Sequence, residues 1–243
     1  MTGDDSRGWH AVGRLNIGER SFCTGSLIAP DLVLTAAHCM YDAETGLRIQ
    51  DGDVQFLADW RGGRASAYRG VKRSIVHPGF HFSDKDFAER VAFDVAILEL
   101  DQPIRNSTIT PFSTDARPSK GAEVGVVSYA HDRADSPSLQ EVCYVLARQG
   151  GSLVLSCDVD FGSSGAPIFT IEDGEARIVS LISAKAKVNG TPVALGTALE
   201  VPLADLMALR GGSDGVFHKS EPVVRRLPRS ETQSATGAKF LRP

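Results

Sequence analysis

The sequence predicts an all-β fold, either a sandwich or a barrel, and three observations support this prediction. Short apolar runs rich in β-branched residues recur between clusters of Gly, Pro, Asp and Asn, a pattern typical of sandwiches and barrels. These runs do not alternate with long helical patterns, which argues against a parallel α/β sheet. A length of 243 residues suits one large all-β domain or two fused barrels, because barrels often exceed about 200 residues as one unit.

The expected elements follow one another along the chain. The clearest strand-like runs are residues 25–28, 32–35, 95–98, 124–127, 152–155 and 178–182. One short helix is expected from Pro202 to Arg210, where three apolar side chains fall on one face and Gly211 is a natural stop. Residues 213–243 are rich in Ser, Arg, Pro and Gly, so we expect a polar, mobile tail there. The alternative is that this tail packs on a domain formed by residues 1–212.

Composition and charge narrow the classes of protein to which the chain could belong. Hydrophobic residues make up 42% and charged residues 23%, which is ordinary for a globular protein. The net charge is -4 and the pI about 5.9, so we expect no nucleic-acid partner, which would call for a basic face. No apolar run approaches the roughly 18 residues that a membrane span needs, and we expect no membrane association.

The cysteines bear on the cellular compartment. There are four, at Cys23, Cys39, Cys143 and Cys157, and four cysteines allow three pairings. The sequence has no CxxC pair of the kind that metal sites usually contain. Two disulfides formed in an oxidising compartment are therefore expected. The polar start of the chain, MTGDDSR, does not read as a leader, and we expect a secreted or periplasmic protein whose leader is absent from this sequence.

Three segments carry the residue types that amide hydrolysis by a serine requires: a hydroxyl, a base, a carboxylate that orients the base, and donors for the oxyanion. His38 is the next-to-last residue of the run LVLTAAHC, and Asp94 precedes the apolar run of FDVAILEL. Ser164 lies in FGSSGAPIF. A carboxylate ahead of a buried strand needs a partner, and the Nδ1 hydrogen of His38 would supply one.

Taken together, in the order His, Asp, Ser, these segments resemble the chymotrypsin/trypsin family of serine endopeptidases, and the resemblance covers roughly residues 9–210. It implies a double six-stranded antiparallel β-barrel, with one barrel in residues 8–112 and the other in residues 113–212, and a short C-terminal helix. It implies a catalytic triad of His38, Asp94 and Ser164. The oxyanion hole would consist of the N–H groups of Gly162 and Ser164. This family is the reference example of a Ser-His-Asp catalytic triad.

The resemblance also implies a Cys23–Cys39 disulfide that fixes the turn bearing His38. Closing a loop of this size is worth about 3 kcal/mol in the loop-entropy description. The remaining cysteines, Cys143 and Cys157, flank Gly150-Gly151, which indicates a hairpin clamped across its strands. This second disulfide is one of two departures from the animal trypsins.

The other departure is Ser163, which stands where those enzymes have an aspartate that pairs with a new N-terminal amine. A serine has no charge for that pair, so we expect the oxyanion loop to be ordered without cleavage at one fixed bond. Both departures look closer to the bacterial branch of the family, which includes the glutamyl endopeptidases.

The same resemblance implies a substrate preference. Asp158, six positions before the nucleophile, would lie at the floor of the pocket for the side chain before the scissile bond. Ser183 would lie on the strand that pairs with substrate backbone, and Gly196 would keep the pocket open. A buried carboxylate there favours Lys or Arg. Two alternatives stay open: Asp158 faces solvent, or Lys185 neutralises it.

The predicted function is therefore a serine endopeptidase that acts on protein or peptide substrates as a monomer, with no cofactor and no metal. Asp51 and Asp53 could bind calcium on a loop, but two acids there are usually just solvated. The main alternative is a catalytically inactive binding protein on the same fold, because fold alone does not settle activity. An α/β-hydrolase esterase is excluded, since it needs a GxSxG elbow and the chain order Ser, Asp, His.

Overall fold

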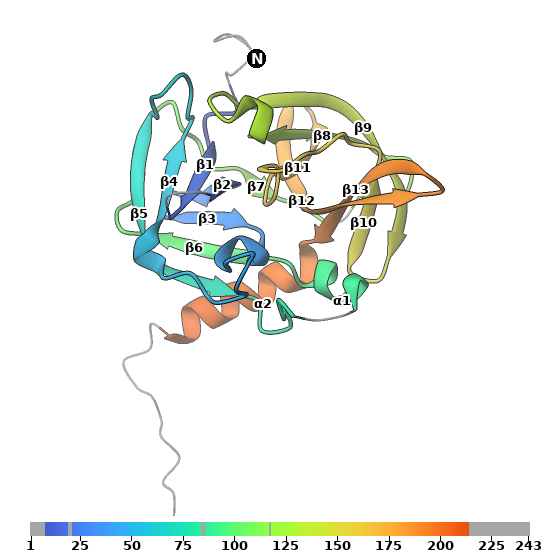
Figure 1. The fold of residues 1–243 in the computed structure, drawn as a ribbon. Coiled ribbons are helices and arrows are strands. Elements are labelled where there is room, and N and C mark those ends of the chain that lie inside the picture. Colours follow the sequence, from blue (N-terminus) through green and yellow to red (C-terminus); the bar gives the residue numbers. More distant parts are fainter. Residues whose placement is uncertain (1–7, 19–20, 84–85, 117, 214–243) are drawn as a thin grey trace, which may run out of the picture.

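The structure is a computed structural model that describes residues 8–18, 21–83, 86–116 and 118–213. Two antiparallel β-barrels lie side by side, the first built from the N-terminal half and the second from the C-terminal half of these residues (Figure 1). The expected all-β fold with a double six-stranded barrel is confirmed. Residues 214–243, for which we predicted a mobile tail, lie outside the described residues.

The first barrel closes in the order β1-β2-β3-β6-β5-β4. Its closure comes from β1, which pairs with β2 on one side and β4 on the other. Every residue of β6 is buried, and all but Glu99 are apolar. The strands are β1 (Val12–Ile17), β2 (Ser21–Ala29), β3 (Leu32–Thr35), β4 (Val54–Ala58), β5 (Ala67–Val76) and β6 (Ala96–Leu100).

The second barrel follows the order β11-β8-β9-β10-β13-β12, and pairing of β11 with β12 closes it. A two-residue strand, β7 (Ser113–Thr114), adds in parallel to β12. In β9, buried Cys143 and Val145 alternate with exposed neighbours, which is the period of a strand with one face in the core. The barrel strands are β8 (Glu123–Ser128), β9 (Ser138–Gln149), β10 (Ser152–Leu155), β11 (Pro167–Glu172), β12 (Glu175–Val188) and β13 (Thr191–Ala198).

Helices are few among the described residues. The expected C-terminal helix is present as α2 (Glu200–Ser213) and runs past Gly211, where we had expected it to stop. A second helix, α1 (Phe87–Ala92), was not predicted; Asp86 caps it by accepting hydrogen bonds from the N–H groups of Ala88 and Glu89. Three short 3₁₀ turns complete the set: η1 (Ala37–Met40), η2 (Asp51–Asp53) and η3 (His131–Arg133).

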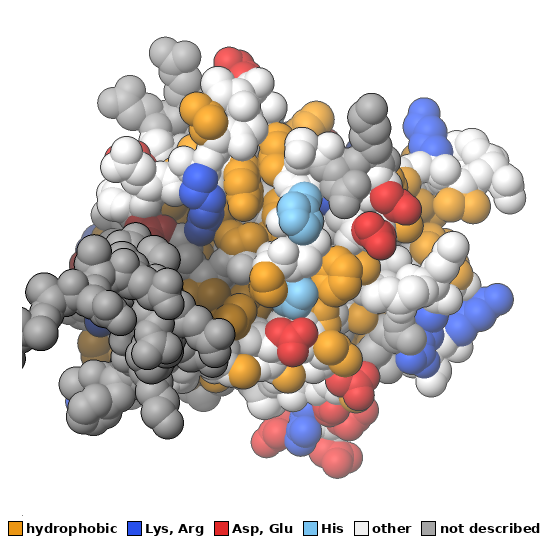
Figure 2. Space-filling view, turned by 90° about the horizontal axis from the view of Figure 1, so that it is seen from below, with side chains coloured by type: hydrophobic (Ala, Val, Ile, Leu, Met, Phe, Trp, Pro, Cys, Tyr) orange, Lys and Arg blue, Asp and Glu red, His pale blue; other side chains and the backbone are white. Residues whose placement is uncertain are grey.

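The hydrophobic core is continuous across the seam between the barrels. The core of the first barrel reaches Tyr129 and Phe169 of the second barrel and Leu203 and Leu206 of α2. A separate apolar cluster fills the second barrel. On the face that carries α2, hydrophobic side chains are interspersed with acidic and basic ones (Figure 2). No described helix is long and apolar enough to cross a bilayer.

Candidate active site

The register of two strands brings His38 and Asp94 together. β3 and β6 are antiparallel neighbours, and Thr35 at the end of β3 pairs with Ala96 at the start of β6. His38 follows Thr35 within η1, and Asp94 immediately precedes the strand. Both side chains are therefore placed at the same edge of the first barrel.

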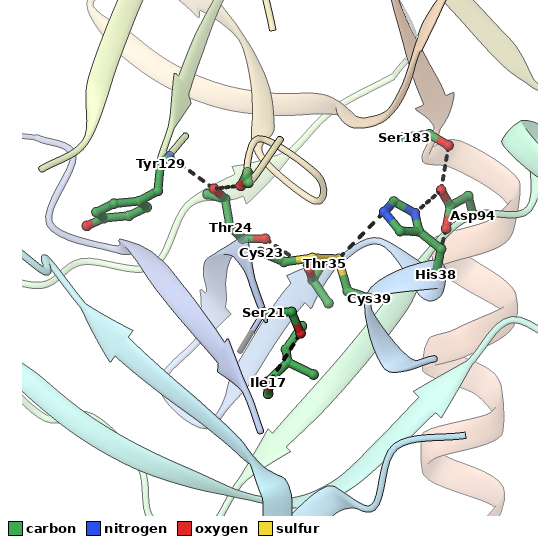
Figure 3. The surroundings of a disulfide bond; sticks show 11 residues. Ile17, Ser21, Cys23, Thr24, Thr35, His38, Cys39, Asp94, Tyr129 and Ser183 are labelled. Carbon is green, nitrogen blue, oxygen red and sulfur yellow. Dashed lines mark hydrogen bonds and ion pairs between the residues drawn. A yellow bond between two sulfur atoms is a disulfide. The ribbon is translucent and has the colours of Figure 1, made fainter. Parts of the chain in front are cut away.

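Asp94 is a buried carboxylate whose two oxygens are both engaged. Its side chain accepts hydrogen bonds from the His38 backbone N–H (2.8 Å, Oδ1), from His38 Nδ1 (2.7 Å, Oδ2) and from Ser183 Oγ (2.5 Å, Oδ2). Figure 3 shows this chain from Ser183 through Asp94 to His38. Because an ionised carboxylate only accepts, the network assigns the proton to Nδ1 and leaves Nε2 of neutral His38 as the acceptor. The imidazole is thus held in the tautomer that a general base requires.

Opposing influences set the pKa of His38. Burial of the imidazole works to lower the pKa, and the nearby Arg90 guanidinium does so too. The charge of Asp94 and its hydrogen bond raise the pKa, and together they outweigh the burial, so the pKa lies above the ordinary histidine value. Asp94 therefore favours the protonated form of His38.

A disulfide anchors the turn that carries His38. Cys23 of β2 is bonded to Cys39 of η1, the residue next to His38 (Figure 3). The second disulfide joins Cys143 of β9 to Cys157, two residues beyond β10, and so clamps the hairpin whose turn is Gly150-Gly151. Both pairings are those expected from the sequence. Among the described residues, Cys23, His38 and Cys39 form a cluster of potential metal ligands, but the two sulfurs are already bonded to each other.

The loop that carries Ser164 docks onto the first barrel through its backbone. The Ser164 carbonyl accepts a hydrogen bond from the Thr24 N–H (2.9 Å), and the Gly162 carbonyl accepts one from Thr24 Oγ1 (2.9 Å). Thr24 is adjacent to Cys23, so the serine loop and the histidine turn are tied to the same strand. This common anchor places Ser164 and His38 on either side of the seam between the barrels.

Two glycines make this docking possible. Gly165 has φ +76°, and a Cβ there would lie 2.2 Å from Thr35 Oγ1 and 2.4 Å from the Thr24 carbonyl oxygen. Gly162 has φ +94°, and a Cβ there would lie 2.4 Å from the Phe22 ring. Only glycine tolerates both the left-handed conformation and the close approach. Neither the Gly162 N–H nor the Ser164 N–H donates to another described residue, which leaves two backbone donors available beside the serine.

The structure does not join all members of the expected triad. His38 and Asp94 are hydrogen-bonded, but no hydrogen bond links His38 Nε2 to Ser164 Oγ; Nε2 lies 3.9 Å from Cys39 Sγ instead. Such catalytic hydrogen bonds are often long or absent in proteins without substrate and tighten in the complex. Ser164 remains partly accessible at the seam.

Ser163 is fully buried and neutral, where an aspartate would need a cationic partner. Its hydroxyl donates towards Ser128 Oγ (3.2 Å) and the Tyr129 carbonyl oxygen (3.5 Å). Its N–H donates to the Asp160 carbonyl oxygen (3.0 Å). Hydroxyl and backbone hydrogen bonds thus hold the loop at this position without an ion pair.

A pocket of about 200 Å³ opens beside Ser164, and its lining corrects the expected roles of Asp158 and Gly196. Asp158 is exposed, its N–H donates to Gln140 Oε1 (2.9 Å), and it does not line the pocket. In this loop, which follows β10, Val159 is buried while its neighbour Asp158 is exposed. Gly196 also lies outside the lining; a Cβ on it would meet Ser180 and Ile168 in the barrel core.

Ser183 lines this pocket, and its hydroxyl additionally holds Asp94, a contact that the expected role in substrate binding did not include. The described residues around the pocket are Val159, Asp160, Phe161, Ser164, Ile182, Ser183, Ala184 and Lys185. Lys185 was named as a possible neutralising group for Asp158; in the structure its Nζ lies 3.9 Å from Asp160 Oδ1.

A second pocket, of about 230 Å³, lies on the other side of His38. Phe80, Phe82 and Phe87 line it together with Val91 and Arg90. Sequence reasoning did not identify this pocket, because three of these five residues belong to the unpredicted helix α1. The signal that could have revealed the helix is Asp86 as an N-cap ahead of it.

Comparisons with known proteins agree with this geometry. The Trypsin family profile matches residues 3–192. Serine protease 23 of Bos taurus is 28% identical over 205 residues, covering 74% of this chain and 54% of that protein. The glutamyl endopeptidase of Bacillus licheniformis is 26% identical over 172 residues, covering 69% and 51%. The chain thus spans about half the length of the curated relatives it matches.

Solved structures share the fold at low sequence identity. A Glu endopeptidase in complex with MPD superposes with a TM-score of 0.71 at 18% identity, covering 87% of this chain and 95% of that chain. A scabies mite inactivated protease paralogue superposes with a TM-score of 0.68 at 14% identity, covering 85% and 94%. With the family profile spanning most of the chain and two closed barrels meeting at the His38 seam, this chain belongs to the trypsin family, with the fold of the chymotrypsin/trypsin-like serine proteases.

Proposed function

We propose that this chain is a serine endopeptidase in which Ser164 is the nucleophile, His38 the general base and Asp94 the residue that orients His38. The observation that carries the proposal is the buried Asp94, whose hydrogen bond to Nδ1 leaves Nε2 of His38 as the acceptor. The Ser164 loop docks on Thr24 of β2, next to the Cys23 that is bonded to Cys39. A base oriented in this way next to a serine is the arrangement that activates a hydroxyl for acyl transfer.

The proposed reaction has two halves. His38 Nε2 takes the proton of Ser164 Oγ as the oxygen attacks the substrate carbonyl, and the N–H groups of Gly162 and Ser164 stabilise the oxyanion. His38 then protonates the departing amine, which leaves an acyl group on Ser164. Water, deprotonated by His38, attacks this ester, and His38 then returns the proton to Ser164 Oγ as the acid is released. Asp94 stays ionised and stabilises the imidazolium formed in each half.

A preference for Lys or Arg before the scissile bond is not part of this proposal. That expectation depended on a buried Asp158 at the floor of the pocket, and Asp158 is exposed and outside the lining. The two disulfides support a further proposal, that the protein acts in a secreted or periplasmic setting where disulfides persist.

The test is hydrolysis of an unstructured protein such as casein and of a fluorogenic peptide library. Ser164→Ala should lose nearly all turnover while keeping the parent's melting temperature. His38→Ala should lose as much turnover but melt at a lower temperature, because it leaves the buried Asp94 carboxylate without its Nδ1 partner. The double variant should turn over substrate no more slowly than either single variant, because the residues act as a unit. Residual turnover on the order of 10³–10⁴-fold over water is expected from the remaining oxyanion donors.

Ser119→Ala, at an exposed serine away from the seam, is the matched control and should be as active as the parent. Full activity of Ser164→Ala would overturn the assignment of the nucleophile. A folded parent that binds peptides of the library but hydrolyses none would favour the alternative, a protease fold that only binds.

A further inference from the structure

The pocket beside Ser164 has an apolar interior and a charged rim. Val159 and Ile182 are buried and form its inner wall with Ala184. Asp160 and Lys185 also line it, with about half of each side chain exposed (51% for both). These two are the charged residues among the described residues that line the pocket, and they have opposite signs.

The two charges come from opposite walls and reach each other. Asp160 lies in the loop that carries Ser164, and its Oδ1 is fixed by the Phe161 N–H at 2.9 Å. Lys185 lies on β12, two residues beyond Ser183, where it pairs with Ala194 of β13. Lys185 Nζ is 3.9 Å from Asp160 Oδ1, so the ion pair connects the nucleophile loop to the strand along the pocket.

This arrangement has a consequence for the side chain that enters. A cationic side chain would be attracted by Asp160 and repelled by Lys185. An anionic side chain would be attracted by Lys185 and repelled by Asp160. Neither therefore gains a net counter-charge. Behind the rim, the buried lining residues are apolar Val159 and Ile182 and the polar Ser183, whose hydroxyl is already donated to Asp94. A charged group placed among them loses its hydration without a counter-charge. An uncharged apolar side chain has no such cost and gains from burial.

We propose that the Asp160–Lys185 pair is the specificity determinant of this pocket. Because the two charges neutralise each other, the enzyme cleaves after uncharged apolar residues. Loss of Asp160 should favour anionic side chains, and loss of Lys185 should favour cationic ones. This inference rests on the proposed function, because it assumes that the pocket beside Ser164 receives the side chain before the scissile bond. It assigns Asp160 and Lys185 a part in choosing substrates rather than in the chemistry.

The test compares four proteins on four peptides. The proteins are the parent, Asp160→Asn, Lys185→Met and the double variant; the peptides carry Leu, Gln, Glu or Lys before the scissile bond. Asp160→Asn keeps an acceptor for the Phe161 N–H but leaves Lys185 unneutralised, so kcat/KM for Glu relative to Gln should rise about five- to tenfold. Lys185→Met leaves Asp160 alone, and kcat/KM for Lys relative to Gln should rise by a similar factor.

The parent and the double variant should both prefer Leu, because both present a pocket with no net charge. Asp158→Asn and Lys187→Met remove one charge of each sign from positions outside the lining and should leave the order of the four peptides unchanged. Single variants that keep the parent's ratios of Glu and Lys to Gln would overturn the inference, as would a parent that prefers Lys or Glu to Leu.

A binding measurement separates this inference from the proposed function. The same substitutions are placed in the Ser164→Ala background, and binding of the four peptides is measured by fluorescence anisotropy. If no protein cleaves but the preferences in binding switch as described, the proposed function fails and the pocket inference stands. If the parent cleaves and neither cleavage nor binding switches, the pocket inference fails and the proposed function stands.

Discussion

At the residue scale, the most informative group is His38, whose pKa is set by burial and by neighbours of opposite charge. Burial and the Arg90 guanidinium lower the pKa, and Asp94 raises it by more than both together. A raised pKa in the folded state means that the His38–Asp94 pair stabilises the fold fully below the unfolded pKa and loses this contribution as pH rises through the folded pKa. The proposed activity has the opposite dependence, because only neutral His38 accepts a proton.

Arg90→Gln should move the acid limb of the pH–rate profile to higher pH. The substitution removes a positive charge that lowers the pKa of His38, so a higher pH is needed to neutralise the imidazole. The measurement is kcat/KM against pH between about 5 and 9, where histidines titrate. Lys187→Met, which removes a positive charge on β12 far along the strand from Ser183, is the control and should leave the midpoint in place. An acid limb of Arg90→Gln at the parent's pH or lower would contradict this account of His38.

The sequence indicated candidate site residues more completely than it indicated their contacts and exposure. His38, Asp94 and Ser164 were predicted from three motifs through their joint resemblance to the chymotrypsin/trypsin family, and the structure joins the first two by a hydrogen bond. At the pocket, the sequence left open whether Asp158 lies at the floor or faces solvent, and the structure has it exposed. Local sequence could not decide between the two, because the direction of a side chain in this loop depends on packing around the Cys143–Cys157 disulfide. The hydrogen bond from Ser183 to Asp94 joins residues 89 positions apart, and local sequence gives no signal for such a contact.

At the scale of the element, the loop from Gly162 to Gly165 is held in a shape that only its glycines allow. The loop approaches β2 closely enough for the Thr24 N–H to reach the Ser164 carbonyl oxygen at 2.9 Å. A positive φ alone costs a residue with a Cβ about 1–2 kcal/mol. At Gly165 the close contact with Thr35 and Thr24 adds to that cost.

Gly165→Ala should therefore destabilise the protein by well over the cost of the backbone conformation alone, and it should abolish activity by displacing Ser164. Gly190→Ala is the matched control: its φ is +82° and nothing lies within 4 Å of the added Cβ, so it should cost only about 1–2 kcal/mol and keep activity. The free energies of unfolding come from urea titration. Equal destabilisation by the two variants would show that the contact with Thr24 and Thr35 does not matter.

Elements differed in how well the sequence predicted them. The strand-like runs named from sequence fall in barrel strands, apart from Val95, which precedes β6. Short β-branched runs between turn residues favour a strand, and this local preference agrees with the fold here. Helix α1 was missed since six residues are too few to show a helical period. Helix α2 passed Gly211, where the sequence indicated a stop; glycine disfavours but does not forbid a last helical turn.

In the whole molecule, α2 follows the second barrel in sequence but is hydrogen-bonded to the first barrel. Arg210 donates to Glu99 of β6 (Nε to Oε1, 2.7 Å) and to Asp31 (Nη2 to Oδ2, 3.1 Å). Arg73 of β5 donates to the other oxygen of Glu99 at 2.9 Å. Burial alone would raise the pKa of Glu99, but its bonds to Arg73 and Arg210 and their charges outweigh the burial and lower the pKa.

Arg210→Met should destabilise the protein by about 2 kcal/mol, the order of a hydrogen bond to a charged group. Because the folded pKa of Glu99 is lowered, its contribution is present above the unfolded pKa and is lost as pH falls through the folded pKa. The gap between variant and parent should hence be wide at neutral pH and narrow below about pH 4. Arg177→Met is the control, since its ion pairs with Asp115 and Glu175 are exposed and such pairs contribute about 0–1 kcal/mol. A gap that does not narrow in acid would contradict this role for Glu99.

Covalent labelling of the folded protein with diisopropyl fluorophosphate tests whether Ser164 is a nucleophile activated by His38. Intact mass and peptide mapping then identify the modified residue. One adduct per chain is expected, on Ser164 and not on buried Ser163, with labelling lost in His38→Ala. A folded parent that stays unlabelled, or that is labelled on a residue other than Ser164, would contradict the account.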